Sequence, residues 1–252
     1  MPIDLTITNP WRYTAYDSVD GLNDHPDAVP CSGSSSDSSR LTARAIAPFK
    51  QLERQYADLF SSREIQEVNT PPASIMEGKK VKDIDLDECE VINASRDNFD
   101  YIGTSGLSKC IGICARGLNS RNETIMGVCH YTGVRSEPAA ALQLLRSKMD
   151  EKGAGNAKMY LVGGAMSADP DLGSLSAERE LLSLRQQFNI KGVRLHTSIW
   201  EDIYSGEYVN LLMTPDNIYF STEPLYSDGE GDDSDTGSSS FSDTPDTKRA
   251  RN

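Results

Sequence analysis

The stretch that decides the fold runs from Cys110 to Tyr131 and reads CIGICARGLNSRNETIMGVCHY. Two apolar runs, Cys110–Ala115 and Thr124–Tyr131, flank the turn-rich segment Gly117–Asn122. Short apolar runs separated by turn-forming residues predict the two strands of an antiparallel hairpin.

The hairpin predicts which side chains share a face. With the turn centred on Ser120, Cys110 would lie directly opposite His130, and the two Cβ atoms would be about 4.5–5.5 Å apart. The two-residue period of a strand turns Cys129 to the opposite face. The same period places four further residues on the face of Cys110, namely Gly112, Cys114, Met126 and Val128.

A cysteine beside a histidine predicts nucleophilic chemistry, because an imidazole can lower the pKa of a thiol and later protonate a leaving group. The alternative is structural, since a buried cysteine often packs as a small apolar residue. Zinc binding by Cys110, Cys114, Cys129 and His130 is disfavoured, because the spacing is not that of a short zinc knuckle and Cys129 faces away. We therefore expect no metal and no cofactor.

Helical and strand patterns extend outward from the hairpin. A helix is predicted to begin at Pro48, and its apolar face is Phe49, Leu52, Tyr56 and Leu59. Two more helices are predicted, one capped by Ser136 and ending at Gly153, the other capped by Ser176 and running through Phe188. Further strands are predicted at Asp85–Ile92, Ala157–Val162, Val193–Ile199, Tyr208–Met213 and Ile218–Ser221. Strands and helices in this order predict an α+β domain with the helices on one face of a mixed or antiparallel sheet.

Composition divides the 252 residues into four parts. Residues 1–40 are rich in serine and are predicted to be disordered, residues 41–72 to form a helix and a linker, residues 80–224 to form the folded domain, and residues 225–252 to form a disordered acidic tail. The net charge of −13 argues against binding to nucleic acid or to acidic membranes. Five cysteines, an odd number, predict free thiols, and the N-terminus lacks the pattern of a Sec signal.

Two segments resemble the chemotaxis receptor glutamine deamidases (CheD). Thr104–Ile113 (TSGLSKCIGI) is similar to that family's Thr-x-Gly-Leu-Gly-Ser-Cys-Val-Gly-Val segment, and Ala157–Ala165 (AKMYLVGGA) is similar to its Ala-Lys-Ile-Phe-Gly-Gly-Ala segment. The resemblance spans Asp85 to Ser221. It implies a layered α/β/β fold and hydrolysis of protein glutamine. Cys110 would be the nucleophile, His130 the general base and acid, and Thr104 the residue that orients the imidazole.

Departures from the family concern the substrate more than the chemistry. Lys109 replaces a small residue before the cysteine, and the step from Cys110 to His130 is longer. The serine-rich N-terminus and the acidic tail resemble the XopAF-type effector deamidases of plant pathogens. That resemblance implies type III secretion into the cytoplasm or nucleus of a host cell, a secretion chaperone at the N-terminus, and a host protein with an exposed glutamine as the substrate. The bacterial cytoplasm is the alternative location.

Other functions stay open. A degenerate family member would act as an adaptor through its acidic tail, and a lysine amine that intercepted the thioester would make the protein a transglutaminase. A papain-like protease is disfavoured by the short step from Cys110 to His130. His25 and His196 are expected to be incidental, with His196 pointing outward from a strand. Alternation with apolar residues predicts that an acidic series is a solvated strand face: Asp83, Asp85, Asp87, Glu88 and Glu90.

Overall fold

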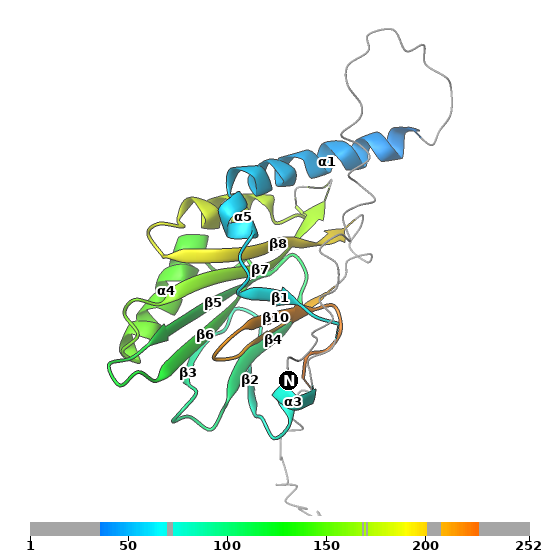
Figure 1. Ribbon diagram of the computed structural model, residues 1–252. Coiled ribbons are helices and arrows are strands. Elements are labelled where there is room, and N and C mark those ends of the chain that lie inside the picture. The colour runs from blue at the N-terminus through cyan, green and yellow to red at the C-terminus, as the bar shows by residue number, and fades with distance from the viewer. Residues whose placement is uncertain (1–35, 70–72, 168, 170, 201–207, 227–252) are drawn as a thin grey trace, which may run out of the picture.

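The computed structural model describes residues 36–69, 73–167, 169, 171–200 and 208–226, and these residues form a layer of helices, a first sheet and a second sheet. Figure 1 shows the two sheets stacked, with helices α1, α4 and α5 on the far side of one of them. The α+β class predicted from the sequence is confirmed at this level. The strands divide between two sheets of five, so the helices and the two sheets form three layers.

The sheet beside the helices contains the hairpin. Its order is β3 (Cys89–Asn93), β6 (Thr124–Tyr131), β5 (Ile111–Leu118), β7 (Lys158–Ser167) and β8 (Ile190–Trp200). The pairs are antiparallel except for β7 and β8, which run parallel. A parallel pair needs a crossover connection, and α5 (Leu175–Ser183) lies within it.

The second sheet has the order β1 (Ile65–Glu67), β10 (Ile218–Ser221), β9 (Val209–Met213), β4 (Tyr101–Leu107) and β2 (Val81–Asp83). Its two edge strands are parallel to their neighbours, and its three central strands are antiparallel. Strand β1 belongs to this sheet although it precedes residue 80. The folded domain therefore starts earlier than predicted.

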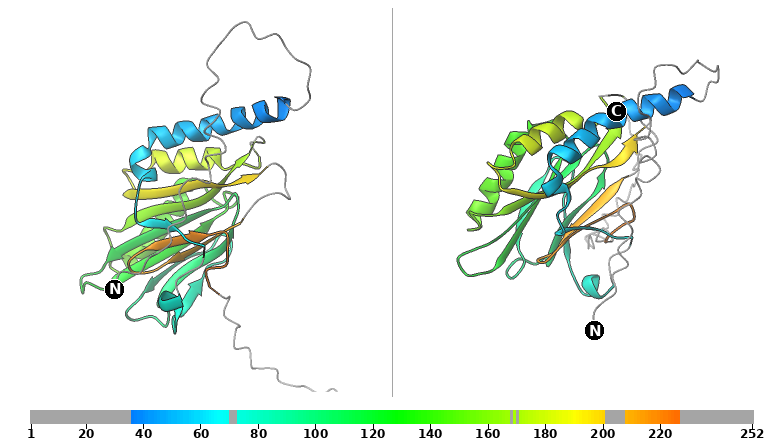
Figure 2. Two further views of the ribbon diagram at one scale, coloured as in Figure 1. Left: turned by 45° about the vertical axis from the view of Figure 1, so that its right-hand side comes forward. Right: turned by 45° about the horizontal axis from the view of Figure 1, so that its top comes forward.

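Helices cover one face of the first sheet, as Figure 2 shows from two sides. The helices of the described residues are α1 (Ser36–Gln55), α2 (Ala57–Phe60), α3 (Ala73–Met76), α4 (Pro138–Glu151) and α5. Leu142, Leu145 and Leu181 pack against Ile113 and Leu161 on that face. None of these helices is long and apolar enough to cross a membrane.

Alternation along the hairpin separates two cores. Ile111, Ile113 and Cys129 face the helices, whereas Cys110 and Cys114 face the second sheet. Met126 and Val128 share the face of Cys110, as predicted. The apolar strands of the first sheet are thus buried on both faces, which explains why they read as continuous apolar runs.

The register of the hairpin differs from the prediction by two residues. Leu118 pairs with Thr124, so the turn is centred on Arg121, and Gly112 rather than Cys110 lies opposite His130. The side chain of Asn119 accepts hydrogen bonds from the N–H groups of Arg121 and Glu123 and fixes this turn. Cys110 keeps its predicted face but precedes the strand, so its position relative to His130 is diagonal.

Several element ends differ from the predictions. Pro48 lies inside α1, which begins at Ser36, so Ser36–Arg40 are helical although they were predicted to be disordered. Helix α5 is capped at Ser174, not Ser176, and ends before Phe188. Helix α4 begins after Glu137 rather than Ser136. Residues 85–88 form a turn rather than the start of a strand, and β7 continues through both glycines to Ser167.

The domain also extends further along the chain than predicted. Leu225 is buried on the outer face of the second sheet with Tyr101 and Leu212. Residue 225 therefore belongs to the domain, and the predicted acidic tail lies almost wholly outside the described residues, as do residues 1–35.

Two bulges interrupt the strands on either side of Cys110. In β4, one extra residue lies between Thr104 and Leu107, where Gly106 has a φ of +73°. In β8, one extra residue lies opposite the stretch from Gly163 to Ala165, and His196 there has a φ of +43°. Bulges redirect side chains and are frequent beside active sites. The second one turns both Leu195 and His196 toward the helices.

Candidate active site

His130 and Thr104 meet between the two sheets. His130 lies on β6 of the first sheet and Thr104 on β4 of the second, and at most 1% of either residue is exposed. Thr104 Oγ1 is 2.7 Å from His130 Nδ1, and it donates a hydrogen bond to the carbonyl oxygen of Ile84 at 2.7 Å. The contact that the family resemblance implied for Thr104 is therefore present.

These two hydrogen bonds determine the tautomer of the imidazole. A carbonyl oxygen can only accept, so the single hydroxyl proton of Thr104 is used on Ile84. The hydroxyl oxygen must then accept from His130, which places a proton on Nδ1. In the neutral ring the lone pair is consequently on Nε2, and this buried atom has no hydrogen-bond partner among the described residues. An unpartnered lone pair on Nε2 is what a general base requires.

Cys110 lies immediately before β5 and on the same face as His130. Its carbonyl oxygen accepts a hydrogen bond of 2.8 Å from the N–H of Gly164, and 8% of the residue is exposed. Diagonal neighbours on a sheet face have Cβ atoms closer than about 7–8 Å, a gap that an imidazole largely spans. No hydrogen bond joins the thiol to Nε2, which has no partner among the described residues.

Gly112 provides the space beside the imidazole. It lies directly opposite His130, and a Cβ atom there would be 3.1 Å from side-chain carbons of Leu107 and Leu211. The two sheets therefore come close together at this point. A larger residue opposite His130 would push them apart.

The thiol and the imidazole both favour their neutral forms. Burial raises the pKa of Cys110, although the N–H of Ser108 and the charge of Lys109 oppose the rise. Burial also lowers the pKa of His130, while the charges of Asp87 and Asp85 act in the opposite direction. We expected the imidazole to lower the pKa of the thiol, and in the resting site burial outweighs any such effect.

Asp87 joins the two loops beside His130, and the sequence analysis did not identify it as a site residue. Its N–H donates to the carbonyl oxygen of His130 at 2.9 Å, and its carboxylate accepts from the hydroxyl of Thr132 at 2.5 Å and pairs with Arg135 at 3.3 Å. Only 14% of its side chain is exposed. The prediction of a solvated acidic strand face is therefore wrong for Asp87, and its φ of +59° shows that it belongs to a tight turn.

The same two loops present exposed apolar side chains. Leu86 is 61% exposed and Val134 is 78% exposed, more than any other large apolar residue in the described part of the chain. Each is next to a residue of the Asp87 contact network. They provide an apolar rim beside the candidate site.

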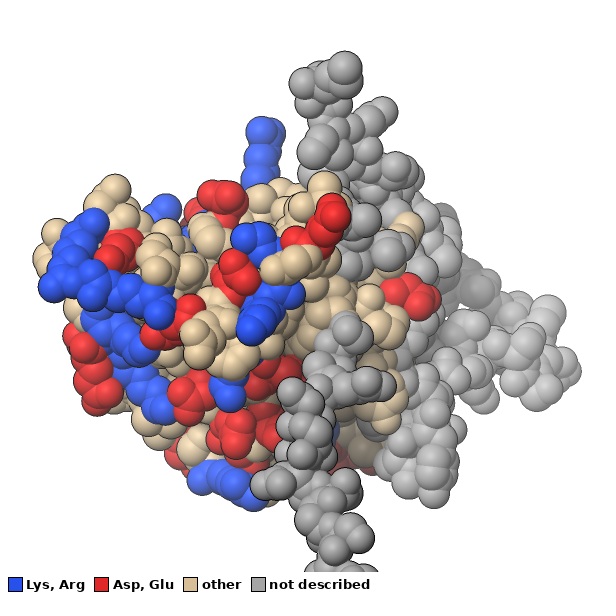
Figure 3. Space-filling view, turned by 90° about the horizontal axis from the view of Figure 1, so that it is seen from below, with Lys and Arg blue, Asp and Glu red and all other residues tan. Residues whose placement is uncertain are grey.

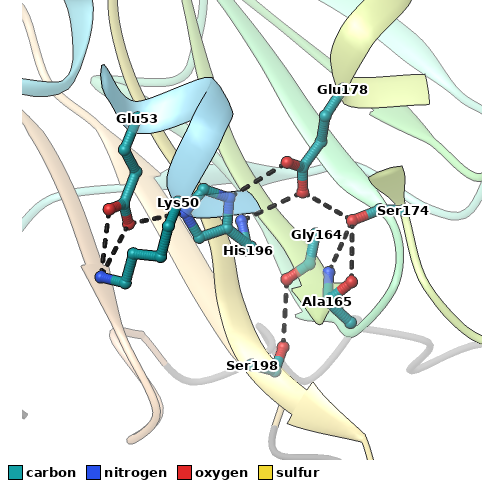
Figure 4. A network of polar contacts seen from close by, with 8 residues as sticks. All are labelled: Lys50, Glu53, Gly164, Ala165, Ser174, Glu178, His196 and Ser198. Atoms are coloured by element: carbon teal, nitrogen blue, oxygen red, sulfur yellow. Dashed lines mark hydrogen bonds and ion pairs between the residues drawn. The ribbon is translucent and has the colours of Figure 1, made fainter. Parts of the chain in front are cut away.

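A second polar cluster lies on the helix side of the first sheet. Figure 4 shows His196 between the carboxylates of Glu53 and Glu178, with Ser174 and Gly164 next to Glu178. His196 is 1% exposed and Glu178 is fully buried. The expectation that His196 is incidental and points outward is wrong. His25 lies outside the described residues.

The remaining cysteines have structural surroundings. Cys89 and Cys129 face each other across β3 and β6, and Cys114 is fully buried between the sheets, where burial raises the pKa of its thiol. Among the described residues no group of histidine, cysteine and acidic side chains is arranged to hold a metal ion. Lys109 reaches the carbonyl oxygen of Asp171 at 3.4 Å and is otherwise a surface residue.

Basic residues do not form an uninterrupted patch on the face shown in Figure 3, where acidic side chains lie among them. Several basic residues of the described part of the chain are paired with carboxylates. Arg96 pairs with Glu123 at 2.7 Å, and Lys152 with Asp97 at 2.9 Å. Such pairing removes charge that a nucleic-acid backbone would need.

Comparison with known proteins adds no relative to this description. No protein-family model matches the chain, and no curated protein matches its sequence. The candidate site therefore rests on the geometry of Cys110, His130 and Thr104.

Proposed function

We propose that the protein is a cysteine-dependent protein-glutamine deamidase, in which Cys110 is the nucleophile, His130 the general base and acid, and Thr104 the orienting residue. The observation that carries the proposal is the fixed tautomer of His130. Thr104 holds the proton on Nδ1, and Nε2 is left as an unpartnered lone pair on the same sheet face as the thiol. Most buried polar atoms in proteins have a hydrogen-bond partner, so an unpartnered Nε2 in the core favours a functional role.

The first half of the reaction starts from a neutral pair. Because burial disfavours both the thiolate and the imidazolium, proton transfer accompanies attack instead of preceding it. The thiol proton passes to Nε2 of His130 while Sγ forms a bond to the carboxamide carbon of the substrate glutamine. The imidazolium then donates that proton to the leaving nitrogen, and ammonia departs from a thioester.

The second half of the reaction restores the enzyme. A water molecule gives a proton to Nε2 and attacks the thioester, the carbon–sulfur bond breaks, and the thiolate takes the proton back. Glutamine and water thus become glutamate and ammonia. Thr104 and the Ile84 carbonyl stabilise the imidazolium in both halves, because Nδ1–H stays hydrogen-bonded throughout.

Negative charge develops on the carboxamide oxygen during attack and on the sulfur during breakdown. The backbone N–H groups of Ser108 and Cys110 act on the sulfur and lower the pKa of the thiol against the effect of burial. We assign stabilisation of the developing oxyanion to backbone N–H groups of this turn.

The proposal includes the family and the setting. The order of Thr104, Cys110 and His130 along the chain, and the helix–sheet–sheet layering, support a CheD-like deamidase. The serine-rich N-terminus and the acidic tail support an effector of the XopAF type that acts on a host protein. Leu86 and Val134, exposed on the loops that flank His130, support a protein substrate, because a protein surface could contact both.

A second candidate function is a catalytically degenerate adaptor. The observation that favours it is the burial of Cys110, which is 8% exposed and has a thiol with a raised pKa. An adaptor would need neither a reactive thiol nor an unpartnered Nε2. Reactivity at Cys110 therefore separates the two functions.

The test uses a peptide with 6-diazo-5-oxonorleucine in place of glutamine. Attack by a catalytic thiol displaces nitrogen gas and leaves the peptide joined to sulfur through a methylene group. We expect labelling of Cys110 alone, identified by peptide mapping, and a much lower rate in His130→Ala. Ammonia release and a Gln-to-Glu mass change in a protein extract, both lost in Cys110→Ser, would complete the assignment. Equal labelling of Cys110 in the wild type and in His130→Ala would reject it.

A further inference from the structure

Three charged residues from three elements meet beneath the Cys110 segment. His196 on β8 has its Nδ1 3.1 Å from Glu178 of α5 and its Nε2 2.9 Å from Glu53 of α1. The N–H of His196 also donates to Glu178 at 3.1 Å. Figure 4 shows the ring lying between the two carboxylates, with Lys50 pairing with Glu53 from the outer side.

The contacts determine the charge state of His196. Carboxylates only accept hydrogen bonds, so both ring nitrogens donate and the ring is an imidazolium. Burial alone would lower the pKa of His196, but hydrogen bonds to Glu178 and Glu53 reverse this and raise it. The fully buried Glu178 carboxylate thereby gains the positive partner that a buried charge requires.

Helix α1 completes the cluster. It supplies Glu53 for the second ring nitrogen and Phe49, whose ring packs edge-on against His196 with centroids 5.4 Å apart. Phe49 is 1% exposed. If the helix moved away, the imidazolium would lose a charged partner and the buried cluster would be open to water.

Glu178 connects this cluster to the nucleophile. Its carboxylate lies so close to the backbone at Gly164 that a Cβ atom there would be 2.5 Å from it. Ser174 donates to the same carboxylate at 2.6 Å and accepts from the N–H of Ala165 at 2.8 Å. The N–H of Gly164 in turn donates to the carbonyl oxygen of Cys110 at 2.8 Å.

We infer that Glu178 and His196 are positioning residues for Cys110 and that helix α1, through Glu53, completes the support. Glu178 fixes the Gly164 backbone, and Gly164 fixes the turn that carries the thiol. None of the three charged residues touches the substrate. The inference rests on the proposed function, because positioning matters only where Cys110 reacts.

The experiment compares Glu53→Ala with the wild type in the full chain. Glu53 is at the surface, with 28% of its side chain exposed, so the variant is expected to fold. Glu53→Gln keeps an acceptor for Nε2 and serves as the conservative variant. Glu180→Gln removes an exposed carboxylate from α5 and serves as the matched control.

Two readouts are measured. The first is hydrogen exchange at the Gly164 amide, which reports the bond to Cys110 and needs no substrate. We expect exchange about tenfold faster or more in Glu53→Ala, since a hydrogen bond to a charged group is lost. The second is labelling by the diazo-oxonorleucine peptide, where we expect the maximal rate to fall about tenfold with little change in half-saturation. Glu53→Gln should recover part of both, and Glu180→Gln should change neither.

The outcomes separate the inference from the proposed function. Unchanged exchange at Gly164 in Glu53→Ala overturns the inference whatever the labelling shows, and so does faster exchange with an unchanged labelling rate. If the wild type is not labelled at Cys110, the proposed function fails. Faster exchange in that case would still support the structural link from α1 to the Cys110 segment.

Discussion

Replacing Thr104 with valine removes one hydroxyl from the centre of the candidate site and keeps the volume of the side chain. The hydroxyl makes two hydrogen bonds of 2.7 Å and is fully buried. The change leaves one polar group without its partner on each side, the carbonyl of Ile84 and Nδ1 of His130. A buried polar group left unpaired costs about 1–3 kcal/mol. With two such groups, we expect the free energy of unfolding to fall by about 2–6 kcal/mol in total.

The same substitution should reduce reactivity at Cys110. One net hydrogen bond of about 1–1.5 kcal/mol favours the tautomer with its proton on Nδ1, and its loss shifts the tautomer population by about tenfold. A proton on Nε2 blocks the general base. The rate of labelling by the glutamine-analogue peptide should therefore fall about tenfold or more.

The assay is urea unfolding followed by fluorescence, together with the labelling rate measured well below the unfolding transition. Thr104→Ser is the matched control, because it keeps the hydroxyl and loses only a methyl group, a change that costs about 1 kcal/mol. A valine variant as stable and as reactive as the serine variant would refute the reasoning about the tautomer.

Three further predictions follow from the packing and the charges. The difference in free energy of unfolding between the wild type and His196→Gln should shrink as the pH rises through the raised pKa of His196. The imidazolium stabilises the fold fully at a pH below 6.5, the ordinary pKa of histidine, and this stabilisation is lost once the pH exceeds the pKa of His196 in the folded protein. Urea unfolding at several pH values measures this difference, and the contribution of His130 cancels because both proteins contain it; a difference independent of pH would contradict the charged cluster. Gly164→Ala should lower the free energy of unfolding by about 2–5 kcal/mol, because Gly164 has a positive φ and a Cβ there would clash with the buried Glu178 carboxylate. The control Gly106→Ala also has a positive φ but no neighbour within 4 Å, so it should lower the free energy of unfolding by only about 1–2 kcal/mol. Equal losses of stability in urea unfolding would show that the carboxylate contact has no role. The rate at which iodoacetamide modifies Cys110 should rise with a pH midpoint above 9.0, the ordinary pKa of a thiol, because burial raises the pKa of Cys110. Peptide mapping after a pH series measures this midpoint, and a midpoint below 9.0 would show that the resting site is a thiolate–imidazolium pair.

The hairpin shows how far the sequence determines a fold. Apolar runs and turn residues were enough to place β6 within its observed bounds and β5 within a few residues, and two-residue alternation assigned Cys110 and Cys129 to the correct faces. The register was wrong, because moving the centre of the turn by one residue, from Ser120 to Arg121, shifts every cross-strand partner by two residues. The side chain of Asn119 decides that turn, and its hydrogen bonds could not be derived from periodicity.

The division of the strands between two sheets was not visible in the sequence. Strand β1 pairs in parallel with β10, about 150 residues further along the chain, and β2 pairs in parallel with β4. Both are edge strands of only three residues, too short for a period to be recognised. Pro48 was also misleading. A proline is typical of the first turn of a helix, so it predicted a helix that begins there, but α1 begins at Ser36 and continues through Pro48.

By itself, the sequence determined the α+β class, the order of α4, α5 and all strands from β3 onward except β4, and the choice of Cys110, His130 and Thr104 as candidates. Only the tertiary structure decided which of these residues touch. Thr104 contacts His130 because the two sheets stack, and Asp87 is hydrogen-bonded to His130 and Thr132 because two turns lie side by side. It also showed that His196, which reads as a polar residue in a strand, is a buried imidazolium between carboxylates of two helices. The physical reason is the distance along the chain over which each signal acts. The periodicity of side chains reports which face of a single element is buried, whereas hydrogen bonds and charge pairs between elements join segments that only the folded core brings together.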